Sequence, residues 1–324
     1  GILSPINKKE TMAVKRTALN KNEYIIVFFL ILGLSVFLMN CGGSESGSKA
    51  PNHPEKITIM QTSVSIGDPH ICSDSTDRLS VIFNIYEALI ELDKDGNYQP
   101  LLAESWLVEE DGLTWIFKLR DGVRFHNEDI LDAEDVVATL GRVLDPAIGG
   151  AFGTQGVYIS YLGNAEISAI NSHTVQIVTE EPMADLLDLL VAMPICPKKE
   201  LNNLPHEYVG SGPYQVSDRS DNQMILKVHE EYWGKTPEYK EIHWIAESDS
   251  EKKVQALMSG QADIASGISI QDAEKIKQTE GDTTICELKS GLCIIFMCNA
   301  QKGPCQDRRI RQALNYAVNG RSNH

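Results

Sequence analysis

Motifs for catalysis and metal binding are missing from this sequence. It contains no G-x-S-x-G nucleophile turn, and neither His206-Glu207 nor His229-Glu230 is followed by the second histidine of a zinc-protease helix. Gly234-Lys235-Thr236 resembles the end of a phosphate-binding loop, but His229 occupies the position that requires glycine. We therefore expect no catalytic residues, no cofactor and no metal site, and predict that the protein is not an enzyme.

Cysteine spacing gives no metal signal either. The seven cysteines include no C-x2-C pair, the spacing typical of zinc and iron–sulfur sites. Buried thiols or one incidental disulfide remain as the two explanations for the six that follow Cys41, and the spacing fixes no pairing. These six are Cys72, Cys196, Cys286, Cys293, Cys298 and Cys305.

Positive charge is also scarce. Lys and Arg number 29 against 45 Asp and Glu, which gives a formal net charge of -16. The field of such a protein repels polyanions, so we do not expect nucleic acid as a partner. The composition is 42% hydrophobic and 23% charged, which is ordinary for a folded chain, and 324 residues are enough for two or three domains.

The one long apolar run has the features of an export signal. Residues 24–39 carry no charge and follow Lys15, Arg16 and Lys21. A basic segment before a short apolar segment is typical of a signal peptide, and the run is shorter than the roughly 20 residues of a membrane span. Residues 1–11 are interpreted as upstream sequence before an initiator at Met12.

The end of this run resembles a bacterial lipoprotein signal. Leu38-Met39-Asn40 precedes Cys41, and a stretch rich in Gly and Ser follows. We predict that residues 1–40 are removed, that Cys41 is lipidated and that residues 41–55 form a flexible tether. A free cysteine after an ordinary signal is the alternative. The predicted location is extracytoplasmic, anchored by lipid to the cell membrane.

Hydrophobic periodicity predicts alternating strands and helices after the tether. Asp-Gly dipeptides at 95–96, 111–112 and 121–122 indicate hairpin turns around a strand in which Trp115 and Phe117 face a core. The predicted strands are 56–61, 114–119, 173–178, 212–217, 223–228, 243–245, 262–265, 283–288 and 292–297, and the predicted helices are 77–89, 133–144, 183–190, 252–258, 270–278 and 307–317.

Asp132 and Asp135 stand three residues apart, as a pair of catalytic carboxylates could. Both fall in the first turn of the predicted helix 133–144, where a carboxylate caps free backbone N–H groups and favours the helix dipole. We therefore interpret the pair as a capping box.

Five sequence blocks, taken in order, resemble one family. They are similar to the family 5 extracellular solute-binding proteins of ABC transporters, which include oligopeptide, dipeptide and nickel receptors. Glu128 departs from the family pattern, which usually has glycine there. The blocks are residues 101–146, 210–214, 232–234, 258–264 and 309–317.

The resemblance implies an α/β fold of the periplasmic-binding-protein-like type II class, with two lobes joined by a hinge. The first lobe would be a discontinuous mixed sheet with helices, formed by residues 56–76 and 190–306. Residues 77–189 would be an inserted subdomain rich in β-hairpins. Residues 307–324 would begin the hinge and a second lobe that is mostly absent, so we expect a C-terminally truncated chain.

The same resemblance implies a function without catalysis. Such a receptor captures a peptide and delivers it to the permease subunits of an ABC importer, and we expect a monomer anchored to the membrane by its lipid. A nickel chelate or another small solute is the alternative ligand. A peptide sensor or chaperone without a permease is the alternative role.

Two loops are predicted to contact the ligand. Each follows the carboxyl end of a predicted strand, where backbone groups are left free toward a cleft. Simple connecting loops remain the alternative. The predicted ligand-binding residues are Val64, Ser65, Ile66 and Gly67 in the first loop and Ala265, Ser266 and Gly267 in the second.

Overall fold

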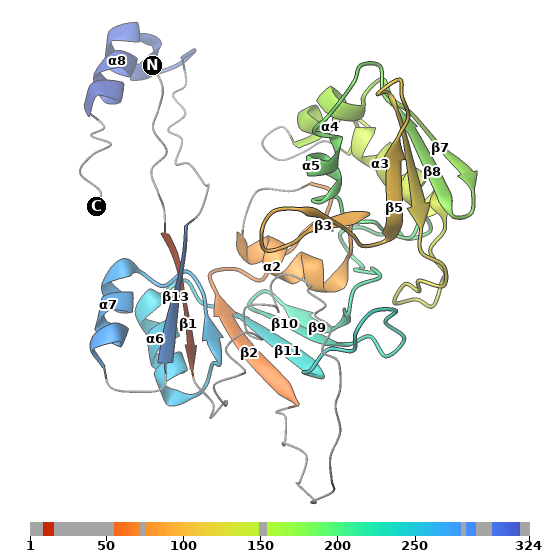
Figure 1. Ribbon diagram of the computed structural model, residues 1–324. Coiled ribbons are helices and arrows are strands. Elements are labelled where there is room, and N and C mark those ends of the chain that lie inside the picture. Colours follow the sequence, from red (N-terminus) through yellow and green to blue (C-terminus); the bar gives the residue numbers. More distant parts are fainter. Residues whose placement is uncertain are drawn as a thin grey trace, which may run out of the picture.

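The structure is a computed structural model that describes residues 9–15, 55–71, 76–148, 154–279, 283–289 and 300–317. The predicted export signal, Cys41 and the predicted strand 292–297 lie outside the described residues. The described residues form three sheets. Figure 1 shows the two larger ones, one with β2 (Lys56–Gln61), β10 (Gln223–Val228) and β11 (Glu241–Ala246) in the lower part of the view and one with β5 (Ala103–Val108), β7 (Glu166–Asn171) and β8 (Thr174–Val178) above it.

The lower sheet has seven strands in the order β13-β1-β12-β2-β11-β10-β9. β2 is parallel to both β11 and β12, and the other neighbouring pairs are antiparallel, so the sheet is mixed as expected. The strands are β1 (Lys9–Lys15), β2 (Lys56–Gln61), β9 (Tyr214–Ser220), β10 (Gln223–Val228), β11 (Glu241–Ala246), β12 (Ile264–Ala265) and β13 (Thr283–Lys289).

Helices follow the strands of this sheet. α6 (Ser250–Ser259) begins after β11 and ends at Gly260, whose φ of 78° is the left-handed conformation expected at a helix end. α7 (Ile270–Gln278) begins after β12, and its first turn is capped by Ser269. Figure 1 shows α6 and α7 beside β1 and β13. α2 (Thr76–Ile85) follows β2. η2 (Pro304–Gln306) and α8 (Arg308–Ala317) contact each other, and Figure 1 shows α8 at the top of the view, apart from the lower sheet.

Two of the three predicted hairpins are confirmed: β3 and β4 pair in a sheet of their own across residues 95–96, and β5 and β6 pair in the upper sheet across residues 111–112. Residues 121–122 join no such pair, because β6 pairs with β5 and β8. The strands of the upper sheet run antiparallel in the order β5-β6-β8-β7, and Trp115 and Phe117 are 5% and 0% exposed in the core beneath them. Trp106 is half-buried against the same core. The elements here are β3 (Ile90–Leu92), β4 (Tyr98–Pro100), β5 (Ala103–Val108), β6 (Thr114–Leu119), β7 (Glu166–Asn171), β8 (Thr174–Val178), α3 (Ala133–Leu144), α4 (Thr154–Leu162) and α5 (Leu186–Leu190).

The prediction of one helix over 77–89 was too long. α2 ends at Ile85 because the following backbone pairs with another segment. The carbonyls of Ala88 and Leu89 accept hydrogen bonds from the N–H groups of Leu102 and Ala103 at 3.3 and 2.8 Å. The Ile85 carbonyl, which would accept the Leu89 N–H in a helix over 77–89, instead accepts the Gly212 N–H at 2.9 Å.

Several elements had no predicted range: β3, β4 and β5, which flank predicted hairpin turns, and also α4, β7, β1 and η2. α4 is rich in apolar residues but shows no helical period of polar and apolar positions. β7 alternates only weakly between polar and apolar residues. β1 spans residues 9–11, which were interpreted as upstream sequence, and residues 12–15, which belong to the segment predicted to be removed with the signal; it pairs antiparallel with both β12 and β13.

Candidate functional site

The carboxyl ends of three parallel strands meet at one edge of the lower sheet. β2 lies between β11 and β12, and backbone bonds continue past the strand ends: the Glu247 N–H donates to Gln61 at 2.8 Å, and the Ser266 N–H donates to Met60 at 2.9 Å. The loops after β2 and β12, which were predicted from the sequence to contact the ligand, are therefore neighbours. In α/β sheets, ligands bind outside such strand ends.

The seven predicted ligand residues differ in what they expose. The side chains of Val64 and Ile66 are buried in the core, at 2% and 1% exposure, whereas Ser65 is exposed. Ala265 is buried, Gly67 and Ser266 are half-buried, and Gly267 is exposed. The first loop therefore presents mostly backbone. Within the described residues, the backbone N–H groups of Val64, Ile66 and Gly67 make no hydrogen bond.

The start of the first loop is held by α2. The Gln61 side-chain amide donates to the carbonyls of Ser63 and Asp77, at 2.7 Å each, and its oxygen accepts a bond from the Ser80 hydroxyl at 3.0 Å. The Asp77 carboxylate accepts the Ser63 N–H at 3.1 Å. Gln61 is 1% exposed, so these bonds are shielded from water and fix the direction in which the chain leaves β2.

The end of the first loop is held by a buried ion pair. The Arg142 guanidinium on α3 donates to both oxygens of Asp68, at 2.6 and 3.1 Å, and to His70 Nδ1 at 2.9 Å. Because arginine only donates, His70 carries its proton on Nε2, which donates to the Pro194 carbonyl at 2.9 Å. Arg78 on α2 donates to the Asp68 carbonyl.

Burial and these partners shift the titration of the cluster. Burial alone would raise the pKa of Asp68, but the hydrogen bonds from Arg142 and from the His70 N–H outweigh it, so this pKa lies below its usual value. Burial, with the nearby Arg142 charge, lowers the pKa of His70 to about 4. Cys196 packs beside His70 and is buried and free, and burial raises its pKa. Cys286 is free as well.

A second buried acid lies where two of the recognised sequence blocks meet. Glu87 accepts hydrogen bonds from the Ser211 hydroxyl at 2.8 Å, the Tyr232 hydroxyl at 2.9 Å and Trp233 Nε1 at 2.9 Å. The Arg120 guanidinium stacks over the Trp233 ring, 4.7 Å from its centre. Burial raises the pKa of Glu87 to about 7 despite these donors. Blocks 210–214 and 232–234 thus build scaffold around Glu87.

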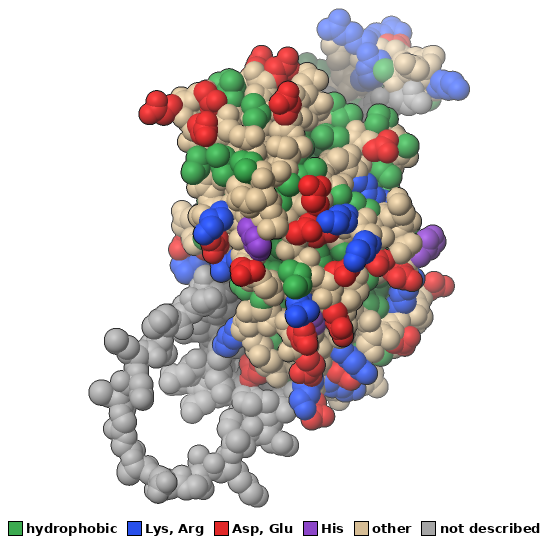
Figure 2. All heavy atoms as spheres, turned by 90° about the vertical axis from the view of Figure 1, so that its right-hand side faces the viewer, with side chains coloured by type: hydrophobic (Ala, Val, Ile, Leu, Met, Phe, Trp, Pro, Cys, Tyr) green, Lys and Arg blue, Asp and Glu red, His purple; other side chains and the backbone are tan. Residues whose placement is uncertain are grey.

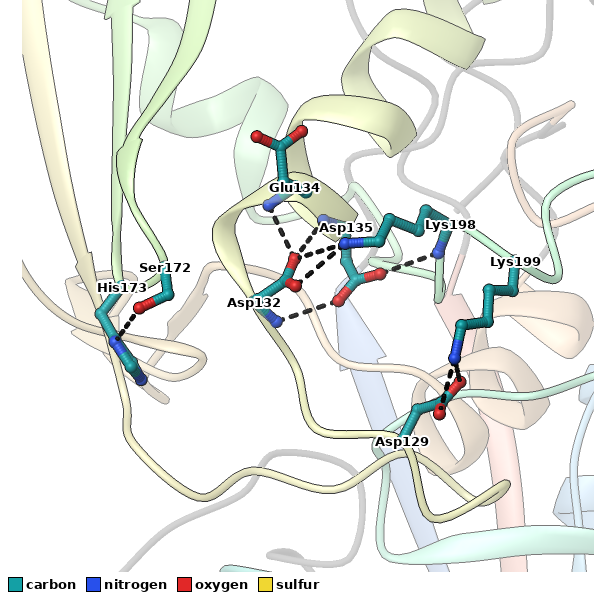
Figure 3. Close-up of polar contacts among 8 residues, drawn as sticks. All are labelled: Asp129, Asp132, Glu134, Asp135, Ser172, His173, Lys198 and Lys199. Carbon is teal, nitrogen blue, oxygen red and sulfur yellow. Dashed lines mark hydrogen bonds and ion pairs between the residues drawn. The ribbon is translucent and has the colours of Figure 1, made fainter.

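The carboxylates of Asp132 and Asp135 cap α3, as predicted. One Asp132 oxygen accepts the N–H groups of Glu134 and Asp135 at 2.8 and 3.1 Å, and an Asp135 oxygen accepts the Asp132 N–H at 2.9 Å. Figure 3 shows Lys198 reaching over the cap to Asp132, at 2.9 Å. The carboxylate oxygens of Asp132 and Asp135 bind backbone N–H groups of the helix end and the Lys198 side chain. The two residues are therefore a capping box and not a pair of catalytic carboxylates.

The described part of the chain shows neither a metal-binding cluster nor a membrane-spanning helix. It holds no cluster of three or more His, Cys, Asp or Glu side chains that could bind a metal ion. None of its helices is long and apolar enough to cross a membrane. On the face shown in Figure 2, acidic and basic side chains are interspersed.

The family follows from a comparison of the sequence with family models. Residues 97–321 match the model of the bacterial extracellular solute-binding proteins, family 5 middle region, and the chain belongs to this family. The family is not enzymatic. The resemblance found from the sequence blocks is confirmed, as is the mixed α/β fold class.

Individual relatives show how much of the family architecture is covered. The chain is 27% identical over 276 residues to the glutathione-binding protein GsiB of Escherichia coli O1:K1 / APEC, covering 82% of this chain and 52% of the relative. It superposes with a TM-score of 0.68 on the binding protein MoaA of A. tumefacien R10 in complex with mannopinic acid, at 25% identity, covering 82% and 55%.

A third relative is a nickel ABC transporter protein from Bacillus halodurans, with a TM-score of 0.59, 28% identity, and coverage of 70% of this chain and 46% of that one. The chain therefore spans about half the length of the relatives it matches.

Proposed function

We propose that the protein is the extracytoplasmic substrate-binding component of an ABC importer and that it captures peptides for a permease. The observation that carries the peptide class is the first loop, whose N–H groups at Val64, Ile66 and Gly67 are unpaired within the described residues. An extended peptide recognised through its main chain needs backbone donors of this kind. The similarity to a glutathione-binding protein supports the same class, since glutathione is a tripeptide.

The remaining parts of the proposal concern location and partners. Lipidation at Cys41 would keep the protein at the outer face of the membrane, beside the permease subunits that receive the ligand. The family belongs outside the cytoplasm, which supports this location. The protein would act as a monomer, with Ser65, Ser266 and Gly267 at the ligand.

Calorimetric titration of the purified chain tests the ligand class. We would use glutathione, trialanine and the nickel complex of histidine as probes. Binding of either peptide, with none of the nickel complex, is expected. If the chain binds the nickel complex alone, the proposed ligand class changes from peptide to metal chelate. If the chain binds no probe at millimolar concentration, the proposal is overturned.

A further inference from the structure

Lys253 is buried without an acidic partner. Its residue exposure is 0%, and Nζ donates to the carbonyls of Ser266 at 2.8 Å and of Gly267 at 3.0 Å. No carboxylate of the described residues forms an ion pair with it. Burying an ammonium group is costly, and lysine is almost never fully buried unless it is paired, so this arrangement calls for a reason.

The position of Lys253 provides that reason. It lies in the first turns of α6, which starts after β11, and it binds the loop after β12. A Cβ placed on Gly267 would lie 3.3 Å from Lys253 Nζ and 3.4 Å from Thr62 Oγ1, in the loop after β2. The ammonium group is therefore packed where the loops after three parallel strands come together.

Nearby carboxylates favour the charged form of the Lys253 ammonium group, against the effect of burial. Burial lowers the pKa of Lys253, while the carboxylates of Asp77, Glu247 and Asp249 oppose that shift from a distance. Asp77 belongs to α2, and the other two follow β11. A charged donor then faces two carbonyls, and charge-assisted bonds of this kind are stronger than neutral ones.

We propose that Lys253 is a positioning residue for the ligand, a role that rests on the proposed function. By drawing the carbonyls of Ser266 and Gly267 inward, it fixes the backbone of the second loop against Thr62. This sets the spacing between the two loops that receive the peptide. An apolar side chain of the same length would fill the space but release both carbonyls.

The experiment compares Lys253→Met with Lys252→Met, which removes the same charge from an exposed neighbour whose nearest acidic partner is Glu247 at 3.8 Å. Affinity for glutathione and trialanine is measured by calorimetry, and amide hydrogen exchange is followed at residues 266–268. In Lys253→Met, which releases both carbonyls, we expect affinity to fall by about tenfold or more and exchange at 266–268 to accelerate. Lys252→Met should change neither.

A third variant separates positioning from folding. Lys253→Arg keeps the charge and the donors and should recover part of the affinity. If Lys253 only stabilised the fold, the affinity of each variant would fall in parallel with its melting temperature. Unchanged affinity and exchange in Lys253→Met would overturn the inference. If the unmodified chain binds no peptide, the proposed function fails, and the exchange measurement still decides whether Lys253 holds the loop.

Discussion

Replacing Arg142 with methionine tests whether the buried ion pair holds the first ligand loop. The variant fills most of the space but removes three hydrogen bonds, two to Asp68 and one to His70. The side chains of Arg142 and Asp68 are only 10% and 8% exposed, so water cannot replace the lost partner. Asp68 would be left as a buried, unpaired charge.

The loss of stability follows from the buried, unpaired charge on Asp68. Breaking a buried pair by removing one partner costs about 3–5 kcal/mol. For a protein of this size each kcal/mol lowers the melting temperature by about 2–4 °C, so a fall of roughly 6–20 °C is expected. The matched control is Arg124→Met, because Arg124 pairs with Glu231 at 3.1 Å with both side chains well exposed. That exposed pair should contribute about 0–1 kcal/mol.

Circular dichroism melts and urea titrations give the free energy of unfolding for each variant. Adding Asp68→Asn to Arg142→Met should recover part of the loss, because a neutral amide replaces the unpaired charge. The pKa of Asp68 is lowered in the folded protein, so its contribution is present above its unfolded pKa of about 4 and is lost as the pH falls through the folded value. A loss below about 1 kcal/mol for Arg142→Met at neutral pH would refute the argument.

Three further predictions concern Glu87, Gly267 and Cys41. Because the pKa of Glu87 is raised to about 7, its stabilising contribution is fully present below its unfolded pKa of about 4.5 and declines as the pH rises through 7. Glu87→Gln should remove that decline in urea titrations at about pH 5 and about pH 8, and an equal decline in both proteins would contradict this. Gly267 and Gly96 both have positive φ, at 62° and 82°, so alanine should cost each about 1 kcal/mol of unfolding free energy. Only Gly267→Ala should also weaken peptide binding in calorimetry, since a Cβ at Gly96 meets nothing within 4 Å, and equal binding by both would argue against the second ligand loop. Fatty-acid labelling of cells should mark the natural protein but not Cys41→Ala, and equal labelling would exclude lipidation there.

Elements with local sequence signals were predicted to the residue. β2, β6 and β10 alternate or carry short apolar runs, and α3 and α7 begin at capping side chains, so neighbours in sequence define them. The end of α2 could not be predicted in this way, because it depends on backbone bonds from Ala88 and Leu89 to a segment more than ten residues away. Tertiary pairing decided that boundary.

The candidate site also has a part that the sequence predicted and a part that it did not. The two loops followed from the rule that ligands bind at strand ends, which needs only the strand predictions. The side chains that hold the loops and the scaffold could not be predicted from the sequence, because their partners are distant in the chain. Arg142 and Asp68 are 74 residues apart, and Ser211 and Glu87 are 124 residues apart. From the sequence alone, Lys253 is expected to be an ordinary exposed lysine on a helix, and only its burial in the structure shows otherwise.

The recognised blocks and the proposed ligand residues occupy different places. Blocks 210–214 and 232–234 supply the donors around buried Glu87, and Asp132 and Asp135 in the first block cap α3. Block 258–264 ends immediately before Ala265. The residues that carry the family resemblance therefore build and brace the scaffold, while the loops proposed to contact peptide lie outside those blocks: residues 64–67 precede the first block, and residues 265–267 follow block 258–264. A shared scaffold with separate ligand loops explains why relatives at 25–28% identity are described with glutathione, mannopinic acid and nickel.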